Sequence, residues 1–265
     1  YNNSLFYYMI DFHNHVVPNI DDGSISLDMS IQMIEKAFKD GFTTIINTIH
    51  LNHPTVHVDK NKIKSYNDSC KNLEKECAKR NIFVKIIPSA EVYYDEQILD
   101  MCLQNNVLIN EKYMLIEFNP SITPYMLEEN FYQLQLRGII PIIAHPERYN
   151  MVQRNINIIK SWIKKGYLIQ INSKSIIEKN KILNATVNKI IKDGLFHLIG
   201  SDAHNDGKRN FCLKECLAFL EKKYGKQVCS QLIDNSDNLL NDKAIKTVKV
   251  RKKTFLDKII GFNKN

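Results

Sequence analysis

Two histidines near the amino end of the chain have the spacing of metal ligands. His13 and His15 lie two residues apart within Asp11–His15, so in an extended strand their side chains share one face. The apolar stretch Tyr7–Ile10 precedes them, and a turn-rich stretch containing Asp21–Gly23 follows. Histidines at the carboxyl end of a barrel or sheet strand are typical metal ligands. The alternative is a pair of surface histidines on an edge strand.

Further ionisable side chains follow short apolar stretches along the chain. Thr43–Ile49 ends at His50, and Ile139–Ala144 ends at His145. The complete set of such residues is His50, Glu91, Glu117, His145, Asp202 and His204. The carboxyl ends of the strands in an α/β barrel meet at one mouth, so we expect these side chains to converge there with His13 and His15. Scattered surface residues would not follow the strand ends, and the pattern therefore favours a metal site.

The apolar stretches are spaced as repeated strand–helix units. Glycines at positions 41, 138, 166 and 194 precede four of the expected strands, as left-handed helix C-caps would. The expected strand centres lie near residues 10, 46, 86, 115, 142, 169 and 198, with about 27 to 41 residues between them. Seven such units predict an α/β fold with a parallel sheet closed into a barrel. An open doubly wound sheet is the alternative.

The expected ligands are too numerous for one tetrahedral zinc site. Mixed imidazole and carboxylate ligands suit two or three divalent ions such as Mn²⁺, Fe²⁺ or Zn²⁺, and no cysteine lies at a predicted strand end. Such ions can form a bridging hydroxide from water and can neutralise phosphoryl oxygens. Hydrolysis of a phosphate ester is therefore the first hypothesis. Amide or amidine hydrolysis in an amidohydrolase-type barrel is the second.

Two arginines are candidates for contacting a phosphate. Arg148 lies three residues after His145, and Arg209 follows the last expected strand. A guanidinium can bind two phosphoryl oxygens at once, although each arginine could equally be an ordinary surface or ion-pair residue. The sequence contains no cysteine followed after five residues by an arginine, and no glycine-rich phosphate-binding motif.

Composition predicts one cytoplasmic domain, residues 9–240, and a basic, partly apolar C-terminal tail, residues 241–265. The six cysteines form no C-x-x-C pair, and no apolar run is long enough to cross a bilayer. Lys243–Asn265 holds eight Lys/Arg and one Asp, which account for the net charge of +7. The rest of the chain is close to neutral, so a nucleic-acid partner is not expected.

The tail itself permits two interpretations. Lys243–Lys253 is basic, and an apolar group follows it: Phe255, Leu256, Ile259, Ile260 and Phe262. The segment is either a disordered, solubilising end or a weak anchor on anionic lipid or an acidic partner. The second interpretation would place the protein at the inner face of the membrane.

Five segments carry a resemblance to a known family: Asp11–His15 with Ile20–Gly23, Ser89–Tyr94, Leu115–Phe118, Ala144–Tyr149 and Ser201–Asn205. Together they resemble the bacterial manganese-dependent protein-tyrosine phosphatases of capsule and exopolysaccharide operons (CpsB/YwqE type). That group is a branch of the polymerase-and-histidinol-phosphatase (PHP) superfamily. The resemblance runs from about Met9 to about Asn238. Many PHP and amidohydrolase proteins share His-x-His, whereas the Ile-Asp-Asp-Gly, Glu-Val-Tyr-Tyr and His-Pro-Glu-Arg elements are more specific.

The resemblance implies a distorted (β/α)7 barrel of PHP type with a trinuclear manganese site. The matching ligand positions are His13, His15, Asp22, His50, Glu91, Glu117, His145, Asp202 and His204. Glu91 would bridge two ions, and Arg148 and Arg209 match arginines that contact phosphate. The stretch after His50 is less family-like, so we interpret His53 and His57 as loop histidines. His197 lies within an expected strand and is interpreted as structural.

The implied activity is hydrolysis of phosphotyrosine in proteins, the expected substrate being a membrane-associated tyrosine autokinase that controls capsular or extracellular polysaccharide synthesis. A metal-bridging hydroxide would attack phosphorus without a covalent enzyme intermediate, and a phenolate leaving group with a pKa of about 10 needs no strong general acid. One alternative is a PHP phosphoesterase acting on a small phosphate, such as histidinol phosphate, or on nucleic acid. The other is a non-catalytic, metal-stabilised scaffold that binds a kinase.

Overall fold

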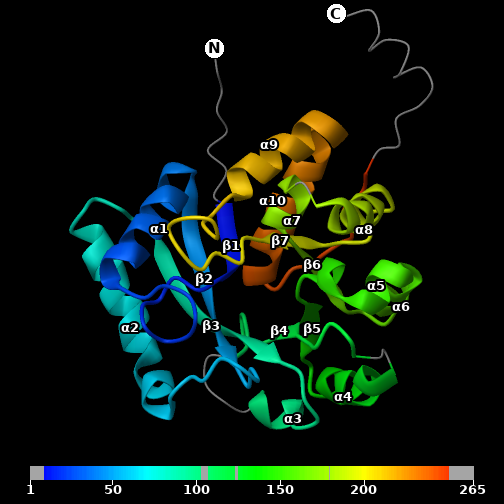
Figure 1. Ribbon diagram of the computed structural model, residues 1–265, viewed down its shortest axis with the longest axis horizontal. Helices are drawn as coiled ribbons and strands as arrows, with labels where there is room; N and C mark the ends of the chain where they lie inside the picture. The colour runs from blue at the N-terminus through cyan, green and yellow to red at the C-terminus, as the bar shows by residue number, and fades with distance from the viewer. Residues whose placement is uncertain (1–8, 103–106, 123–124, 179, 251–265) are drawn as a thin grey trace, which may run out of the picture.

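Seven parallel strands form the centre of the structure, and helices surround them (Figure 1). The computed structural model describes residues 9–102, 107–122, 125–178 and 180–250. The strands follow the chain in order around the barrel: β1 (Met9–Asn14), β2 (Phe42–Leu51), β3 (Lys85–Tyr93), β4 (Tyr113–Glu117), β5 (Ile140–Ile143), β6 (Leu168–Asn172) and β7 (Leu198–Gly200). Each expected strand centre falls within one of these strands or at its edge. The predicted α/β fold, a distorted (β/α)7 barrel, is confirmed.

Helices fill most of the connections between the strands. They are α1 (Leu27–Lys39), α2 (Lys60–Ala78), α3 (Ile98–Met101), α4 (Tyr125–Leu136), α5 (Asn150–Arg154), α6 (Asn157–Lys164), α7 (Ser173–Ile177), α8 (Lys181–Lys192), α9 (Leu213–Tyr224) and α10 (Lys226–Leu240), with a 3₁₀ turn, η1 (Pro146–Arg148). The glycines at 41, 138, 166 and 194 have positive φ angles of 98°, 78°, 87° and 64°. The predicted left-handed helix ends are therefore present where the chain turns into β2, β5, β6 and β7.

Backbone contacts beyond the end of β7 bring the first and last strands together. The amide of His15 donates to the carbonyl of Ala203 at 2.8 Å, and the amide of Asp202 donates to the carbonyl of His13 at 2.6 Å. The carboxylate of Asp11 accepts from the amides of His13 and Ser201 at 3.0 and 3.3 Å. The segments that nearly close the barrel are thus the segments that carry the candidate metal ligands.

Strand β3 is longer than the sequence suggested. It pairs with β2 in parallel register from Thr44↔Lys85 to Leu51↔Val92, which carries the strand past Glu91. Glu91 therefore lies inside β3 rather than beyond its end. The reason is tertiary, because the long β2 offers backbone partners that the local composition of β3 does not reveal.

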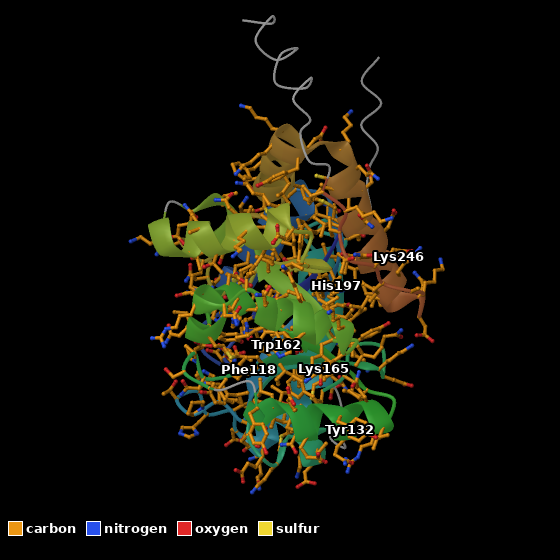
Figure 2. All side chains as sticks on the ribbon, turned by 90° about the vertical axis from the view of Figure 1, so that its right-hand side faces the viewer. Phe118, Tyr132, Trp162, Lys165, His197 and Lys246 are labelled. Atoms are coloured by element: carbon orange, nitrogen blue, oxygen red, sulfur yellow. The ribbon has the colours of Figure 1, made fainter. Side chains whose placement is uncertain are left out.

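Aromatic packing fixes the ends of β4 and β5. The Phe118 ring stacks on Tyr149 with centroids 4.3 Å apart and meets Trp162 edge-on at 5.9 Å, and Figure 2 shows Phe118 and Trp162 close together. The Tyr149 hydroxyl donates to the carbonyl of Ala144 at 2.8 Å and accepts from the amide of Phe118 at 3.3 Å. Burying one such ring stabilises the fold by about 1.5–3 kcal/mol.

Three cysteines lie in the buried core of two helices. Cys70 and Cys77 are buried on α2, and Cys216 is buried on α9. Cys212 is only partly buried, because it precedes α9 instead of lying within it. No described helix combines the length and the apolar character that a membrane span requires.

Part of the expected tail contacts the barrel. The amide of Val248 donates to the carbonyl of Phe196 at 2.9 Å, and the Asn235 side chain donates to the carbonyls of His197 and Lys246 (Figure 2). The domain boundary at residue 240 stays a prediction. The apolar group at Phe255–Phe262 lies outside the described residues.

His197 supplies a testable link between pH and stability. Its Nδ1 accepts from the amide of Ile169 at 3.0 Å, and burial lowers the pKa of the ring to about 4. Between about pH 6.5 and 4 the unfolded chain binds a proton at this ring that the folded chain does not, so stability falls as pH falls, by up to about 3 kcal/mol. We expect His197→Gln to remove this component from the pH dependence of the unfolding free energy, measured in urea. Parallel profiles for both proteins would contradict it.

Candidate metal centre

The carboxyl ends of the strands bring the predicted ligands to one place. His13 comes from β1, His50 from β2, Glu91 from β3, Glu117 from β4, His145 from the second residue after β5, and Asp202 and His204 from the segment after β7. His15 and Asp22 come from the segment between β1 and α1. Most of these side chains are buried, whereas Glu117 is partly exposed and Asp22 is exposed.

Two of these residues adopt a backbone conformation that is rare outside glycine. His145 and Asp202 have φ angles of 31° and 54°, and each lies two residues after the end of its strand, β5 or β7. Left-handed backbone of this kind costs free energy in L-residues and is found most often at functional sites. In the described structure it turns both side chains into the cluster instead of continuing the strand alternation.

Two glycines allow the histidine pair to pack closely. A Cβ atom on Gly23 would lie 2.2 Å from the His15 carbonyl oxygen, and one on Gly200 would lie 2.5 Å from the His13 Cβ. No side chain fits at either position without moving the backbone that carries a candidate ligand. Gly23, which the sequence presents as part of a turn motif, therefore has a second role in packing against His15.

The side chains form four overlapping groups whose ligand atoms lie within 4.8 Å of one another. The groups are His15, Asp22, His50 and His204; His13, His15, Glu91 and Asp202; His50, His53 and Glu117; and Glu91, Glu117 and His145. His15, His50, Glu91 and Glu117 each belong to two groups. All nine predicted ligands are thus brought together, and the shared members suit neighbouring ions better than isolated ones.

Glu91 lies at the centre of this arrangement. Its Oε2 lies 2.9 Å from His13 Nε2, and its Oε1 lies 3.0 Å from His145 Nε2. The Nε2 of His15 and the Nδ1 of His50 lie 3.4 and 3.5 Å from Oε2. Four imidazoles thus surround one buried carboxylate, which belongs to two of the four groups.

Several buried polar atoms of the cluster lack a hydrogen-bond partner. If a metal ion fits this site, it should be able to serve as that partner. Among the described residues, His15 Nε2, His50 Nδ1, Glu117 Oε2 and His145 Nδ1 make no hydrogen bond. Leaving such an atom unpaired in the interior costs about 1–3 kcal/mol. Imidazole and carboxylate donors suit borderline and hard divalent cations, so the donor set fits a centre of this kind.

The histidine rings are oriented from behind by residues that sequence reasoning did not identify. Asp21 Oδ2 accepts from His15 Nδ1 at 2.7 Å and from the amide of His50 at 3.1 Å. Gln170 Oε1 lies 3.0 Å from His13 Nδ1, and Asn172 donates to Asp202 Oδ2 at 2.8 Å. A partner at Nδ1 orients the ring so that Nε2 points into the cluster, as a metal ligand requires. Only Asp21 had a signal in the sequence, as the neighbour of Asp22.

Burial opposes ionisation throughout the cluster, and neighbouring charges decide the outcome. Burial raises the pKa of Glu91, but His13 and the hydrogen bonds from His13 and His145 hold it well below its usual value. Glu117 behaves oppositely, because burial and the negative charge of Glu91 raise its pKa to about 7. A cation between the two carboxylates would remove this repulsion.

The histidines of the cluster fall into two groups by the direction in which their pKa is shifted. Burial lowers the pKa of His13 and His15, but Glu91 for the first and Asp21 for the second raise it above the usual value. Burial and the neighbouring charge of His15 lower the pKa of His50 to about 4. Since a metal binds neutral imidazole, loading an ion at His13 or His15 would release protons.

The two arginines reach the cluster from its rim. Arg148 Nη2 lies 2.9 Å from Asp202 Oδ2, and Arg209 Nη2 lies 3.2 Å from Asp202 Oδ1. Burial raises the pKa of Asp202, but Arg148, and after it His13, hold it far below the usual value. About two-fifths of each arginine side chain is exposed, so both guanidinium groups border the open mouth.

The two histidines that we interpreted as loop residues, His53 and His57, differ in whether they reach the cluster. His53 joins one of the four groups, with its Nε2 3.8 Å from Glu117 Oε2 and its ring 4.8 Å from that of His50. His57 is exposed and belongs to none of the groups found among the described residues. All six cysteines are described, and none belongs to the cluster, so the geometry offers no thiolate nucleophile there.

Comparison with known proteins places the chain among close relatives. The family model for capsular polysaccharide synthesis, CpsB/CapC, matches residues 9–241. The tyrosine-protein phosphatase YwqE of Bacillus subtilis is 36% identical over 89% of this chain and 93% of its own length. The tyrosine-protein phosphatase CpsB of Streptococcus agalactiae is 28% identical over 88% of this chain and 99% of its own length.

The fold agrees with a solved relative. A crystal structure from the pair YwqE of Bacillus subtilis and CpsB of Streptococcus pneumoniae, described as unique metal-dependent tyrosine phosphatases, superposes with a TM-score of 0.83. It is 33% identical to this chain, and the match covers 92% of this chain and all of that one.

Asp21 can be tested as the residue that holds His15 in place. We expect Asp21→Asn to weaken Mn²⁺ binding about 10- to 100-fold, the usual cost of losing a partner behind a histidine ligand. Equilibrium dialysis with metal analysis measures the affinity. Asp28→Asn, on an exposed carboxylate that pairs with Arg80 away from the cluster, is the control with the same change of charge. Equal affinities in the two variants would show that Asp21 does not act through His15.

Proposed function

Because this chain belongs to the capsular polysaccharide synthesis family CpsB/CapC, we propose that it is a metal-dependent phosphatase that hydrolyses phosphotyrosine in proteins. The single observation that carries the proposal is the set of converging imidazoles and carboxylates at the barrel mouth. The relatives of the chain are named as tyrosine-protein phosphatases, which agrees with it. A retired site has no physical need for so many buried ionisable groups, because each one costs free energy unless it is paired.

We assign the metal to the four overlapping groups around Glu91 and propose manganese, in two or three ions, with Fe²⁺ or Zn²⁺ as alternatives. The proposed ligands are His13, His15, Asp22, His50, Glu91, Glu117, His145, Asp202 and His204. Divalent ions held there would polarise the phosphoryl oxygens and activate water at neutral pH. His53 lies close enough to Glu117 to be added to the set.

Arg148 and Arg209 are proposed to bind the phosphoryl group. Each donates one Nη2 to Asp202, and an arginine has five N–H donors, so each retains donors for phosphoryl oxygens. Asp202 in turn sets their positions, because one carboxylate receives both guanidinium groups. Their charge would stabilise the negative charge that gathers on the equatorial oxygens as the bond to the leaving group breaks.

The leaving group requires little help from the protein. A tyrosine phenolate is the conjugate base of a phenol with a pKa of about 10, so it departs without a strong general acid. The described cluster contains no cysteine, and a covalent enzyme intermediate is not part of the proposal. The protein contributes by orienting the phosphate and by holding buried charges in fixed positions.

The natural substrate is proposed to be a membrane-associated tyrosine autokinase that controls capsular or extracellular polysaccharide synthesis, met in the cytoplasm. The family name connects the chain to capsular polysaccharide synthesis, and a phosphatase in that setting needs a phosphotyrosine protein to act on. Membrane contact through the apolar residues after Lys253 stays a prediction.

A substrate panel tests the activity. At fixed Mn²⁺, we expect a phosphotyrosine peptide to be hydrolysed with a kcat/KM at least about tenfold above that of L-histidinol phosphate or a phosphodiester oligonucleotide, because the phenolate leaves more readily. Phosphate release measures the rates. Faster hydrolysis of histidinol phosphate or of the oligonucleotide would replace the proposed activity by one of those two, and no hydrolysis of any substrate would favour a binding scaffold.

Metal removal tests the assigned centre. After chelation and dialysis, we expect phosphatase activity to be lost and the melting temperature to fall, because the buried polar atoms of the cluster again lack partners. Added Mn²⁺ should restore both. His145→Ala should abolish activity while circular dichroism still reports a folded chain. Full activity in protein shown by metal analysis to be metal-free would contradict the assignment.

A further inference from the structure

A groove of about 840 Å³ opens between the segment after β2 and the beginning of α2. Its walls come from residues 51–58 and from one face of the helix, where Lys60, Ile63, Lys64 and Asn67 recur at helical spacing. Met101, at the end of α3, closes one side. None of the metal ligands proposed from the sequence lines this groove.

The groove adjoins the metal centre through His53. This residue lines the groove, and its ring also lies 4.8 Å from the ring of His50 and 5.1 Å from that of Tyr93. Its Nε2 is 3.8 Å from Glu117 Oε2. A peptide whose phosphotyrosine occupies the metal centre can therefore pass His53 and continue into the groove.

The charge of the groove is positive. Lys60 and Lys64 are exposed, and neither side chain forms a salt bridge or hydrogen bond with any residue that the structure describes. The described lining contains no aspartate or glutamate. Asp59 is the N-cap of α2, and its side chain is engaged with the amide of Asn61, while the first turn of the helix contains no acidic residue. An anionic ligand would therefore meet the two lysine side chains within the groove.

Apolar side chains complete the lining. Val56, Val58 and Ile63 are half-buried, and they line the same groove as the lysines. Such a surface suits an extended peptide that has both acidic and apolar side chains, and the lysine heads then provide charge complementarity.

We propose that this groove binds an acidic stretch of the substrate, with Asp or Glu side chains near the phosphotyrosine paired with Lys60 and Lys64. The inference rests on the proposed function and deepens it, because it names a class of sequence that the phosphatase prefers. Neither lysine takes part in the chemistry, so their contribution is to affinity and selectivity.

Two phosphotyrosine peptides of equal length test the proposal, one flanked by glutamates and one by glutamines. At low ionic strength we expect the wild-type protein to hydrolyse the glutamate peptide with a kcat/KM about three- to tenfold higher, the effect of two exposed ion pairs. The preference should shrink as salt is added, since salt screens exposed charges. In the double variant K60Q/K64Q it should disappear.

The matched control is the double variant K62Q/K71Q, which removes the same charge from exposed positions of α2 outside the groove. It should keep the wild-type preference. Equal kcat/KM for the two peptides in the wild type, or a preference that K60Q/K64Q retains, would overturn the inference and leave the proposed function intact. A smaller oligomer in K60Q/K64Q would assign the groove to a second copy of this chain and overturn it too. No turnover of either peptide by metal-loaded protein would overturn the proposed function itself.

Discussion

The structure depends on one buried carboxylate. Water cannot solvate its negative charge, so neighbouring groups must balance it. Glu91 is buried inside β3, and the imidazoles of His13 and His145 hold its two oxygens. Burial alone would protonate it, and the surrounding positive charge keeps it ionised. The segments that bring imidazoles toward Glu91 are constrained, as the close packing of Gly200 against His13 and the left-handed backbone of His145 show.

The barrel meets this constraint with backbone geometry as well as with side chains. The contacts that bring β1 and β7 together run between the His13 and Asp202 main chains, so barrel closure and ligand placement cannot vary independently. Asp11 connects them further by accepting amide protons from His13 and Ser201. A barrel that opened at this seam would lose the relative positions of two ligand-bearing segments. At this seam, the same backbone hydrogen bonds therefore stabilise the fold and set the geometry of the candidate centre.

Much of this could be read from the sequence, because strand ends have local signatures. Apolar stretches ending at a histidine or carboxylate located β1 to β5 and β7 and their ligands, and glycine C-caps located four strand starts. Gln170 and Asn172 could not be found in this way, since their role depends on which neighbour faces them across the barrel. His53 does lie in a loop, as the sequence indicated, but its position beside Glu117 could not be found in this way, because it depends on the packing of its ring against His50.

Chemistry and selectivity draw on different parts of the fold. The ligands around Glu91 come from strands and from segments tied to them by backbone hydrogen bonds, which keeps their geometry fixed. The basic groove is built from Leu51 at the end of β2, the segment that follows it, one face of α2 and Met101, and its two lysines belong neither to a strand nor to the candidate ligands. The arginines that border the mouth follow β5 and β7, whereas the groove follows β2. In the proposed complex, the arginines would hold the phosphoryl group and the groove would hold the flanking residues. Of the residues that line the groove, His53 alone also belongs to the candidate metal groups found in the described part of the chain, so the groove lysines can be exchanged without changing a candidate ligand.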